Sequence, residues 1–310
     1  IEHFAGAFPL WIAPVQVVII PVHNAFEHLG ACLAALSESS PGAEILAIDD
    51  ASTDPRVVPM LEEWAGRSPH RTLICRNENR GFVHTANLGM SQTRGDVVLL
   101  NSDTEVADGW LVALGRCLAS DRGIATATPW TNNGEIASLP EFCTANPAPA
   151  DRNAVARTVG DCGAPSYPDL PTAVGFCMAV SRRSIERVGL FDEETFGRGY
   201  GEENDFSMRA AGSGMRNVLC DDAYVVHHCG ASFGPLGLKT GESAMQRLLE
   251  LHPGYLDTVT AYIREEYRAL PVLLLRRSPR WTIRGRRPYE PRHNRRYLPP
   301  QPQNRTNADS

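Results

Sequence analysis

Residues 97–106 read Val-Val-Leu-Leu-Asn-Ser-Asp-Thr-Glu-Val, a hydrophobic run that ends in two acids one residue apart. The run predicts a buried strand over residues 96–100. Two carboxylates on a short, stiff segment are hard oxygen ligands of the kind that a divalent ion between phosphates needs. The alternative for Asp103 and Glu105 is a solvated turn after a strand, so the rest of the chain has to decide between the two.

Strands and helices alternate on both sides of this run. Further strands are predicted over residues 15–20, 44–48, 71–75 and 124–128, and helices over 25–39, 55–65, 82–92 and 109–119. This alternation predicts βαβ units and a Rossmann-like, mostly parallel sheet flanked by helices, hence an α/β fold. Ligands bind such sheets at the carboxyl ends of the strands, where Asp49, Asp50 and Asn101–Asp103 fall.

The second half of the chain has a different pattern. Residues 132–170 are rich in Pro, Ala and Asn and predict a functional or mobile loop. Strands are then predicted over 173–180, 217–219 and 223–226, and helices over 182–188, 202–211, 242–251 and 255–268. The expected organisation is an N-terminal extension (1–14), a main domain (15–235), C-terminal helices (236–270) and a disordered Arg- and Pro-rich tail (271–310).

Charge and cysteine content exclude several classes of protein. Residues 271–310 hold ten arginines and two acids, a net charge of +8, so the first 270 residues carry −14 of the total −6. An acidic body argues against a nucleic-acid groove. Eight cysteines without a Cys-x-x-Cys pair predict a reducing compartment rather than a zinc site or disulfide framework. With no apolar run of about 20 residues and no signal peptide, we expect a cytoplasmic protein.

Several separated motifs together resemble a known family. Val18–Asn24, Ala47–Asp54, Asn79–Leu88 with Arg94–Val106, and Gly199–Arg209 occur in the order seen in family 2 glycosyltransferases. The resemblance is closest to the rhamnosyltransferase- and galactofuranosyltransferase-like branch and covers about residues 15–234. It implies a GT-A fold, an inverting mechanism, a nucleoside-diphosphate-sugar donor with UDP or dTDP, and a divalent metal, Mn²⁺ or Mg²⁺.

The same resemblance implies a set of nucleotide-sugar-binding residues at the ends of the predicted strands. The set consists of Pro21, Val22, Asn24, Asp50, Arg80, Ser102 and Asp103. For Arg80 the residues themselves give a reason, because an arginine beside a helix N-terminus suits a diphosphate. The alternatives are an ordinary helix cap with a surface arginine at Arg80, and a Ser/Asp-rich turn around Asp50.

The metal ligands implied by the resemblance are Asp103, Glu105 and His227. Asp103 and Glu105 correspond to the family's Asp-x-Asp motif, with Glu as a longer second acid. His227 is preferred over His228 as the third ligand. Both cannot face one ion if the strand continues, because neighbouring side chains of a strand point to opposite faces. A structural histidine is the alternative.

Residues 199–206 read Gly-Tyr-Gly-Glu-Glu-Asn-Asp-Phe and place paired acids at the start of a predicted helix. By resemblance, Glu203 is the catalytic base that deprotonates the acceptor hydroxyl, with Glu202 as the other candidate. The alternative is two acids favoured by the helix dipole. Asp205 lies either on the acceptor side or in an i,i+4 pair with Arg209.

The acceptor is expected to be a glycan or a lipid-linked, cell-envelope molecule. Gly175, Phe176, Asp205 and Trp130 are the predicted acceptor-side residues, with plain core as the alternative for Phe176. The Arg-rich tail predicts peripheral contact with an anionic membrane, or otherwise only a solvated end.

Two other functions compete with this interpretation. A non-catalytic relative that binds nucleotide or carbohydrate is disfavoured by the joint presence of Asp103, Glu105 and Glu203. Residues 1–21 resemble the junction between the catalytic and anticodon-binding domains of threonyl-tRNA synthetase, and the match then stops. A tRNA-binding module would need a basic main domain, whereas the first 270 residues are acidic.

Overall fold

The computed structural model describes residues 16–228 and 242–265, all within the compact unit Ile1–Ser278. The predicted N-terminal extension and the Arg-rich tail lie outside the described residues. The strands are β1 (Val17–Val22), β2 (Glu44–Asp49), β3 (Arg71–Cys75), β4 (Val97–Leu100), β5 (Thr104–Val106), β6 (Ile124–Trp130), β7 (Asp169–Leu170), β8 (Cys177–Val180) and β9 (Arg216–His227).

The helices are α1 (Phe26–Ser39), α2 (Val57–Gly66), α3 (Phe82–Ser91), α4 (Trp110–Ser120), the short 3₁₀ helix η1 (Glu135–Ala137), α5 (Arg152–Gly160), α6 (Arg182–Val188), α7 (Glu193–Phe196), α8 (Glu202–Gly212) and α9 (Glu242–Leu251). One more helix spans residues 255–265. Among the described residues, no helix is long and apolar enough to cross a membrane.

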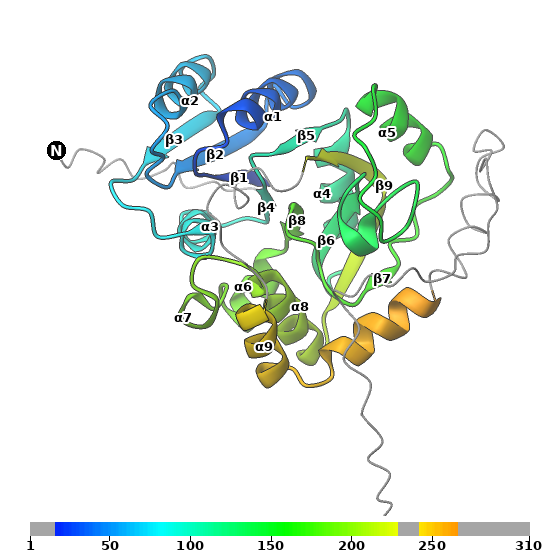
Figure 1. Ribbon diagram of the computed structural model, residues 1–310. Helices are drawn as coiled ribbons and strands as arrows, with labels where there is room; N and C mark the ends of the chain where they lie inside the picture. The colour runs from blue at the N-terminus through cyan, green and yellow to red at the C-terminus, as the bar shows by residue number, and fades with distance from the viewer. Residues whose placement is uncertain (1–15, 229–241, 266–310) are drawn as a thin grey trace, which may run out of the picture. The chain divides into compact units, whose positions relative to one another are not determined.

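The described strands form one sheet in the order β3-β2-β1-β4-β8-β6-β9-β5, with β7 also paired to β9. The first four strands are mutually parallel, as predicted. Because β8 runs antiparallel to both of its neighbours, the whole sheet is mixed rather than mostly parallel. The predicted α/β architecture is confirmed, and the carboxyl ends of β1, β2 and β4 meet at one edge (Figure 1).

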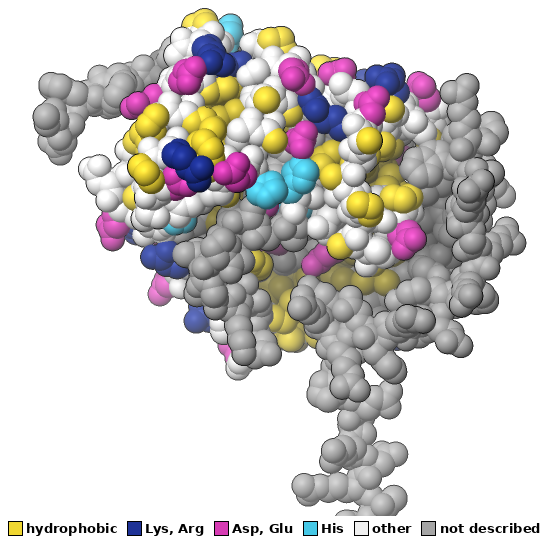
Figure 2. Space-filling view, turned by 45° about the horizontal axis from the view of Figure 1, so that its top comes forward, with side chains coloured by type: hydrophobic (Ala, Val, Ile, Leu, Met, Phe, Trp, Pro, Cys, Tyr) yellow, Lys and Arg dark blue, Asp and Glu magenta, His cyan; other side chains and the backbone are white. Residues whose placement is uncertain are grey.

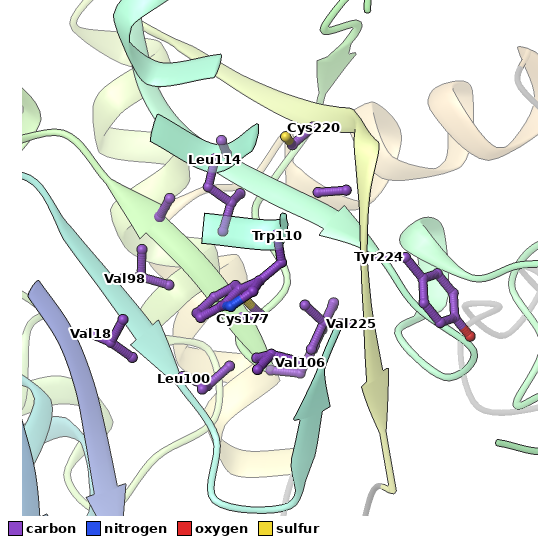
Figure 3. Packing of buried hydrophobic residues seen from close by; sticks show 14 of the residues in the cluster. Val18, Val98, Leu100, Val106, Trp110, Leu114, Cys177, Cys220, Tyr224 and Val225 are labelled. Atoms are coloured by element: carbon purple, nitrogen blue, oxygen red, sulfur yellow. The ribbon is translucent and has the colours of Figure 1, made fainter. Parts of the chain in front are cut away.

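Side chains alternate between the two faces of the sheet. On β1, Val18 and Ile20 belong to a cluster with α1, α2 and α4, whereas Val17 and Ile19 belong to a second cluster with α3, α6, α8 and α9. Figure 1 shows the corresponding helices on opposite sides of the sheet. In the first cluster Trp110 lies among strand residues such as Val98 and Leu100 (Figure 3).

The patternless segment 132–170 is not a plain loop, because it contains η1, α5 and β7. The prediction missed α5, which begins where the Asp151 side chain accepts a hydrogen bond from the Ala154 N–H. The two strands predicted over 217–219 and 223–226 are one continuous strand, β9. The pairing of β9 with β6 shifts register between Cys220 and Tyr224. In that stretch the carboxylates of Asp221 and Asp222 accept hydrogen bonds from Ser166 and Arg116, respectively.

Candidate active site

Asp103 lies in the turn between β4 and β5, and β9 brings His227 beside it. The Nε2 atom of His227 is 3.5 Å from Oδ1 of Asp103, whose side chain is buried. Burial alone would raise the pKa of the Asp103 carboxyl. A protonated His227, through its hydrogen bond and its charge, outweighs burial and lowers that pKa below its ordinary value, so Asp103 is an anion at neutral pH.

The ring of His227 is held on its other side. Its Nδ1 lies 2.6 Å from the carbonyl oxygen of Asn133, and the ring stacks on Phe176 with centroids 5.3 Å apart. A carbonyl accepts only from N–H, so in the neutral imidazole Nδ1 carries the proton and Nε2 presents its lone pair to Asp103. A lone pair facing a carboxylate is the arrangement expected of two ligands of one cation.

Glu105 turns away from this pair. Its Oε1 lies 2.7 Å from Nε2 of His228, and its Oε2 lies 3.5 Å from Nη1 of Arg152. The ring of His228 also lies against His28 of α1, with centroids 5.2 Å apart. Each of the two acids therefore pairs with a different one of the two histidines.

The three predicted metal ligands are thus not brought together. Within residues 16–228 and 242–265, no group of three His, Cys, Asp or Glu side chains is arranged to hold a metal ion. Asp103 and His227 fit such an ion as a pair. Two ligands each about 2.1 Å from one ion are roughly 3.0–3.5 Å apart at octahedral or tetrahedral angles, and a histidine ligand ordinarily donates its second ring N–H to a carbonyl. A third ligand role for Glu105 stays a prediction.

Asp50, a predicted nucleotide contact, is buried in a nest of donors. Its carboxylate accepts from the backbone N–H of Gly81 at 2.7 Å, from the N–H of Arg80 at 3.1 Å and from Nη1 of Arg76 at 2.9 Å. These bonds fasten the end of β2 to the start of α3. They differ from the Ser/Asp-rich turn offered as the alternative role, because their donors come from the end of β3 and the start of α3. A contact of Asp50 with a nucleotide stays a prediction.

Two polar residues at the carboxyl end of β1 shape the same edge. Asn24 has a left-handed backbone, and its Oδ1 accepts from the N–H groups of Thr53 at 2.8 Å and Asp54 at 3.0 Å. His23, which the sequence analysis did not single out, contacts the Asp50 carbonyl and Asn79 through Nδ1. The segment after β1 is therefore tied to the segment after β2.

The remaining predicted nucleotide-binding residues differ in exposure. Pro21 and Val22 end β1, and Ser102 is buried in the turn after β4. Arg80 is half-exposed, with Nη2 3.2 Å from Oε1 of Glu193. Their roles toward a nucleotide stay predictions.

The paired acids at the start of α8 occupy different environments. Glu202 is 5% exposed, and its Oε2 has no hydrogen-bond partner among the described residues. Glu203 is only partly buried, and its carboxyl carbon lies 3.6 Å from the position that a Cβ on Gly175 would occupy. Because Gly175 precedes the Phe176 that stacks on His227, Glu203 borders the same site as Asp103 and His227.

Both glutamates hold their protons more tightly than an ordinary carboxyl. Burial raises the pKa of Glu203 to about 7, and the negative charge of Glu135 acts in the same direction. Burial raises the pKa of Glu202 well above its ordinary value, reinforced by the charge of Glu203. A pKa near neutrality suits a carboxylate that takes up a proton during a reaction.

The other predicted acceptor-side residues are largely internal. Trp130 is 6% exposed and Phe176 is fully buried in the core cluster, as the core alternative had it. Asp205 makes the predicted pair with Arg209, at 2.8 Å, and a second bond of 2.8 Å to Nε2 of His252. Figure 2 shows histidine and acidic side chains side by side on one face of the molecule.

Different parts of the chain match different known proteins. Residues 17–141 match the model of glycosyl transferase family 2. Short stretches match threonine–tRNA ligases: that of Rubrobacter xylanophilus is 33% identical over 100 residues, covering 32% of this chain and 15% of the ligase. The ligase of Borreliella afzelii is 70% identical over 27 residues, covering 9% of this chain and 5% of the ligase. The chain thus spans 15% or less of the length of these curated relatives, and the resemblance to ligases is local.

Solved structures share the fold. The mannosyltransferase PcManGT from Pyrobaculum calidifontis, in complex with GDP-Man and Mn²⁺, has a TM-score of 0.52 and 19% identity, covering 86% of this chain and 81% of that one. S. aureus TarS 1–349 in complex with UDP-GlcNAc has a TM-score of 0.53 and 14% identity, covering 83% of this chain and 76% of that one. GalNAc-T7 with UDP, GalNAc and Mn²⁺ has a TM-score of 0.53 and 17% identity, covering 69% of this chain and 43% of that one. The predicted GT-A fold is confirmed.

Proposed function

We propose that this chain, whose residues 17–141 match the model of glycosyl transferase family 2, moves a sugar from a nucleoside-diphosphate-sugar to an acceptor hydroxyl with inversion, using a divalent metal. The observation that carries the proposal is the pairing of Asp103 with His227 at the carboxyl edge of the sheet, with Glu203 bordering the same site. The solved structures of similar fold include complexes with UDP, UDP-GlcNAc, GDP-Man and Mn²⁺.

Asp103 and His227 would hold the metal. Its ligands would be one carboxylate oxygen and the Nε2 lone pair, together with oxygens of the donor diphosphate. Carboxylate and phosphate oxygens suit both Mn²⁺ and Mg²⁺. When bound, the ion supplies positive charge that stabilises the departing diphosphate. Pro21, Val22, Asn24, Asp50, Arg80 and Ser102 are proposed to line the nucleotide part of the same edge, where UDP or dTDP is the expected carrier.

Glu203 is proposed as the base. Its carboxylate takes the proton of the acceptor hydroxyl as that oxygen forms a bond to the anomeric carbon. The bond between the anomeric carbon and the phosphate oxygen breaks on the opposite face, and the diphosphate leaves with the electron pair. Glu202 is less suited to this role, because its carboxyl is buried and an acceptor would have to displace packed side chains to reach it.

A non-catalytic carbohydrate-binding relative is the competing function. It requires no base, whereas a partly exposed carboxyl with its pKa raised to about 7 beside the metal pair is what an acid–base residue needs. The proposed acceptor is a glycan or lipid-linked molecule, reached with the help of the Arg-rich segment after residue 271.

A donor-hydrolysis screen tests the proposal. The full chain is incubated with UDP-, dTDP- and GDP-sugars, with Mn²⁺, with Mg²⁺ and with EDTA, and release of the nucleoside diphosphate is followed. We expect release from one donor class, lost in EDTA and in Glu203→Gln. Release that is equal in EDTA would contradict the metal role, and absence of release from every donor would favour the non-catalytic relative.

A further inference from the structure

His227, the last residue of β9, pairs with β5 on one side, and on the β6 side it is held by a side chain instead of a strand. Oδ1 of Asn132 accepts a hydrogen bond from the His227 N–H at 2.9 Å, and Nδ2 of Asn132 donates to the His227 carbonyl at 3.1 Å. The pairing of β6 with β9 ends earlier, at Trp130 and Tyr224. The amide of Asn132 therefore supplies both backbone partners that a neighbouring strand would have supplied to His227.

Asn132 is itself fully engaged. It is 3% exposed, and its Nδ2 makes a second bond, 3.1 Å long, to the carbonyl of Asn146. The backbone N–H and the side-chain Nδ2 of Asn146 both donate to the Asn132 carbonyl, at 3.0 and 3.1 Å. These reciprocal bonds close the start of the long segment between β6 and α5 into a hydrogen-bonded loop around Asn132.

The next residue of the same loop sets the ring of His227. The carbonyl of Asn133 accepts from Nδ1 at 2.6 Å, so in the neutral ring the Nε2 lone pair faces Asp103. The direction of that carbonyl follows from the anchoring of Asn132, one peptide unit earlier. Two successive residues thus fix the backbone and the tautomer of one side chain.

We propose that Asn132 is a positioning residue that preorganises His227 for metal binding. The inference rests on the proposed metal-dependent function and assigns to the loop the task of presenting the Nε2 lone pair beside Asp103. Because a ligand's hydrogen-bonded support commonly contributes 10–100-fold to metal affinity, removing the Asn132 amide is expected to weaken Mn²⁺ binding by about tenfold or more.

The chain offers a matched control. The side-chain amide of Asn87 hydrogen-bonds both backbone groups of Phe191 in the same way. It donates to the Phe191 carbonyl at 2.9 Å and accepts from the Phe191 N–H at 3.0 Å. Asn87→Ala therefore removes an equivalent pair of buried bonds in α3 without touching His227. Mn²⁺ is titrated into the full chain by electron paramagnetic resonance for the wild type, Asn132→Ala, Asn87→Ala and His227→Ala.

We expect Asn132→Ala to bind Mn²⁺ at least tenfold more weakly than Asn87→Ala, and we expect the same substitution to weaken binding no further when it is introduced into His227→Ala. Equal affinities of Asn132→Ala and Asn87→Ala would overturn the inference while leaving the metal site in place. Equal affinities of the wild type and His227→Ala would overturn the metal assignment and the inference together. Asn132→Ser, which keeps a short hydroxyl, replaces Asn132→Ala if the latter does not fold.

A metal-free readout separates positioning from general destabilisation. The ¹⁵N shifts of the His227 ring, recorded without metal at alkaline pH, report which nitrogen carries the proton. We expect the Nδ1–H tautomer in the wild type and in Asn87→Ala, and a mixture of tautomers in Asn132→Ala. An unchanged tautomer in Asn132→Ala would contradict the proposed role.

Discussion

Nε2 of His227 and Oδ1 of Asp103 lie 3.5 Å apart because β9 runs antiparallel to β5, with His227 in register with Thr104. The register places one histidine beside the acid before Thr104, while Glu105, the acid after it, pairs with His228 instead. The two acids of the sequence motif therefore have different partners and need not share a function.

Asp103→Ala is expected to abolish both activity and Mn²⁺ binding, since it removes the carboxylate of the proposed ligand pair. Glu105→Gln serves as its comparator, because Glu105 is engaged with His228 and Arg152. We expect the loss of Mn²⁺ affinity, measured by calorimetry with UDP present, to be much smaller for Glu105→Gln. Losses of equal size would restore Glu105 as a third ligand.

Glu203→Gln is expected to retain donor binding but to lower turnover by about 100-fold or more, as usual for a lost general base. The base is active only when ionised, and burial raises the pKa of Glu203 to about 7. In the wild type kcat/KM should therefore rise with pH through about 7. Activity that is lost in Glu202→Gln and kept in Glu203→Gln would identify Glu202, and not Glu203, as the base.

Local sequence patterns predicted the elements around this site well. The run that ends at Leu100 and the helix over residues 182–188 were readable because each carries its own hydrophobic period. The identity of Asp103 as the acid at the strand end followed from the same local pattern.

Long-range contacts were not readable in this way. The partner of each acid depends on the register between β5 and β9, which local periodicity does not encode. The support of His227 by Asn132 joins two segments far apart in the chain, and the sequence showed only that the segment containing Asn132 was unusually long. The donors to the Asp50 carboxylate could not be predicted either, because they lie in the turn before α3, far from Asp50 in the chain.

Gly81→Ala is expected to destabilise the fold by roughly 1–3 kcal/mol. Gly81 has a φ of +89°, and an added Cβ would lie 2.7 Å from the Arg198 Cα. Relief of that clash would disturb the N–H that Gly81 donates to Asp50, so nucleotide binding should weaken as well. Gly160→Ala, where a Cβ would meet nothing within 4 Å, is the control and should be nearly neutral in thermal unfolding.

Residues 276–296 hold nine arginines and one acid, and this charge predicts salt-sensitive binding to anionic vesicles. Each arginine near an anionic leaflet contributes roughly 1 kcal/mol, an attraction that high salt screens. Truncation after Ala269 should abolish sedimentation with vesicles while transfer to a soluble acceptor survives. A full chain that stays in the supernatant at low salt would contradict the membrane proposal.

Glu202→Gln is expected to stabilise the protein at alkaline pH. The pKa of Glu202 is raised well above its usual value by burial and by the charge of Glu203, so the folded state binds the proton more tightly than the unfolded state. Wild-type stability should therefore fall as pH rises above the unfolded pKa, until the folded group also ionises.

Glutamine cannot ionise, and its oxygen can still accept hydrogen bonds. We expect the melting temperature of Glu202→Gln to exceed that of the wild type at pH 8 and the difference to shrink toward pH 5. A difference that does not depend on pH would contradict the raised pKa of Glu202.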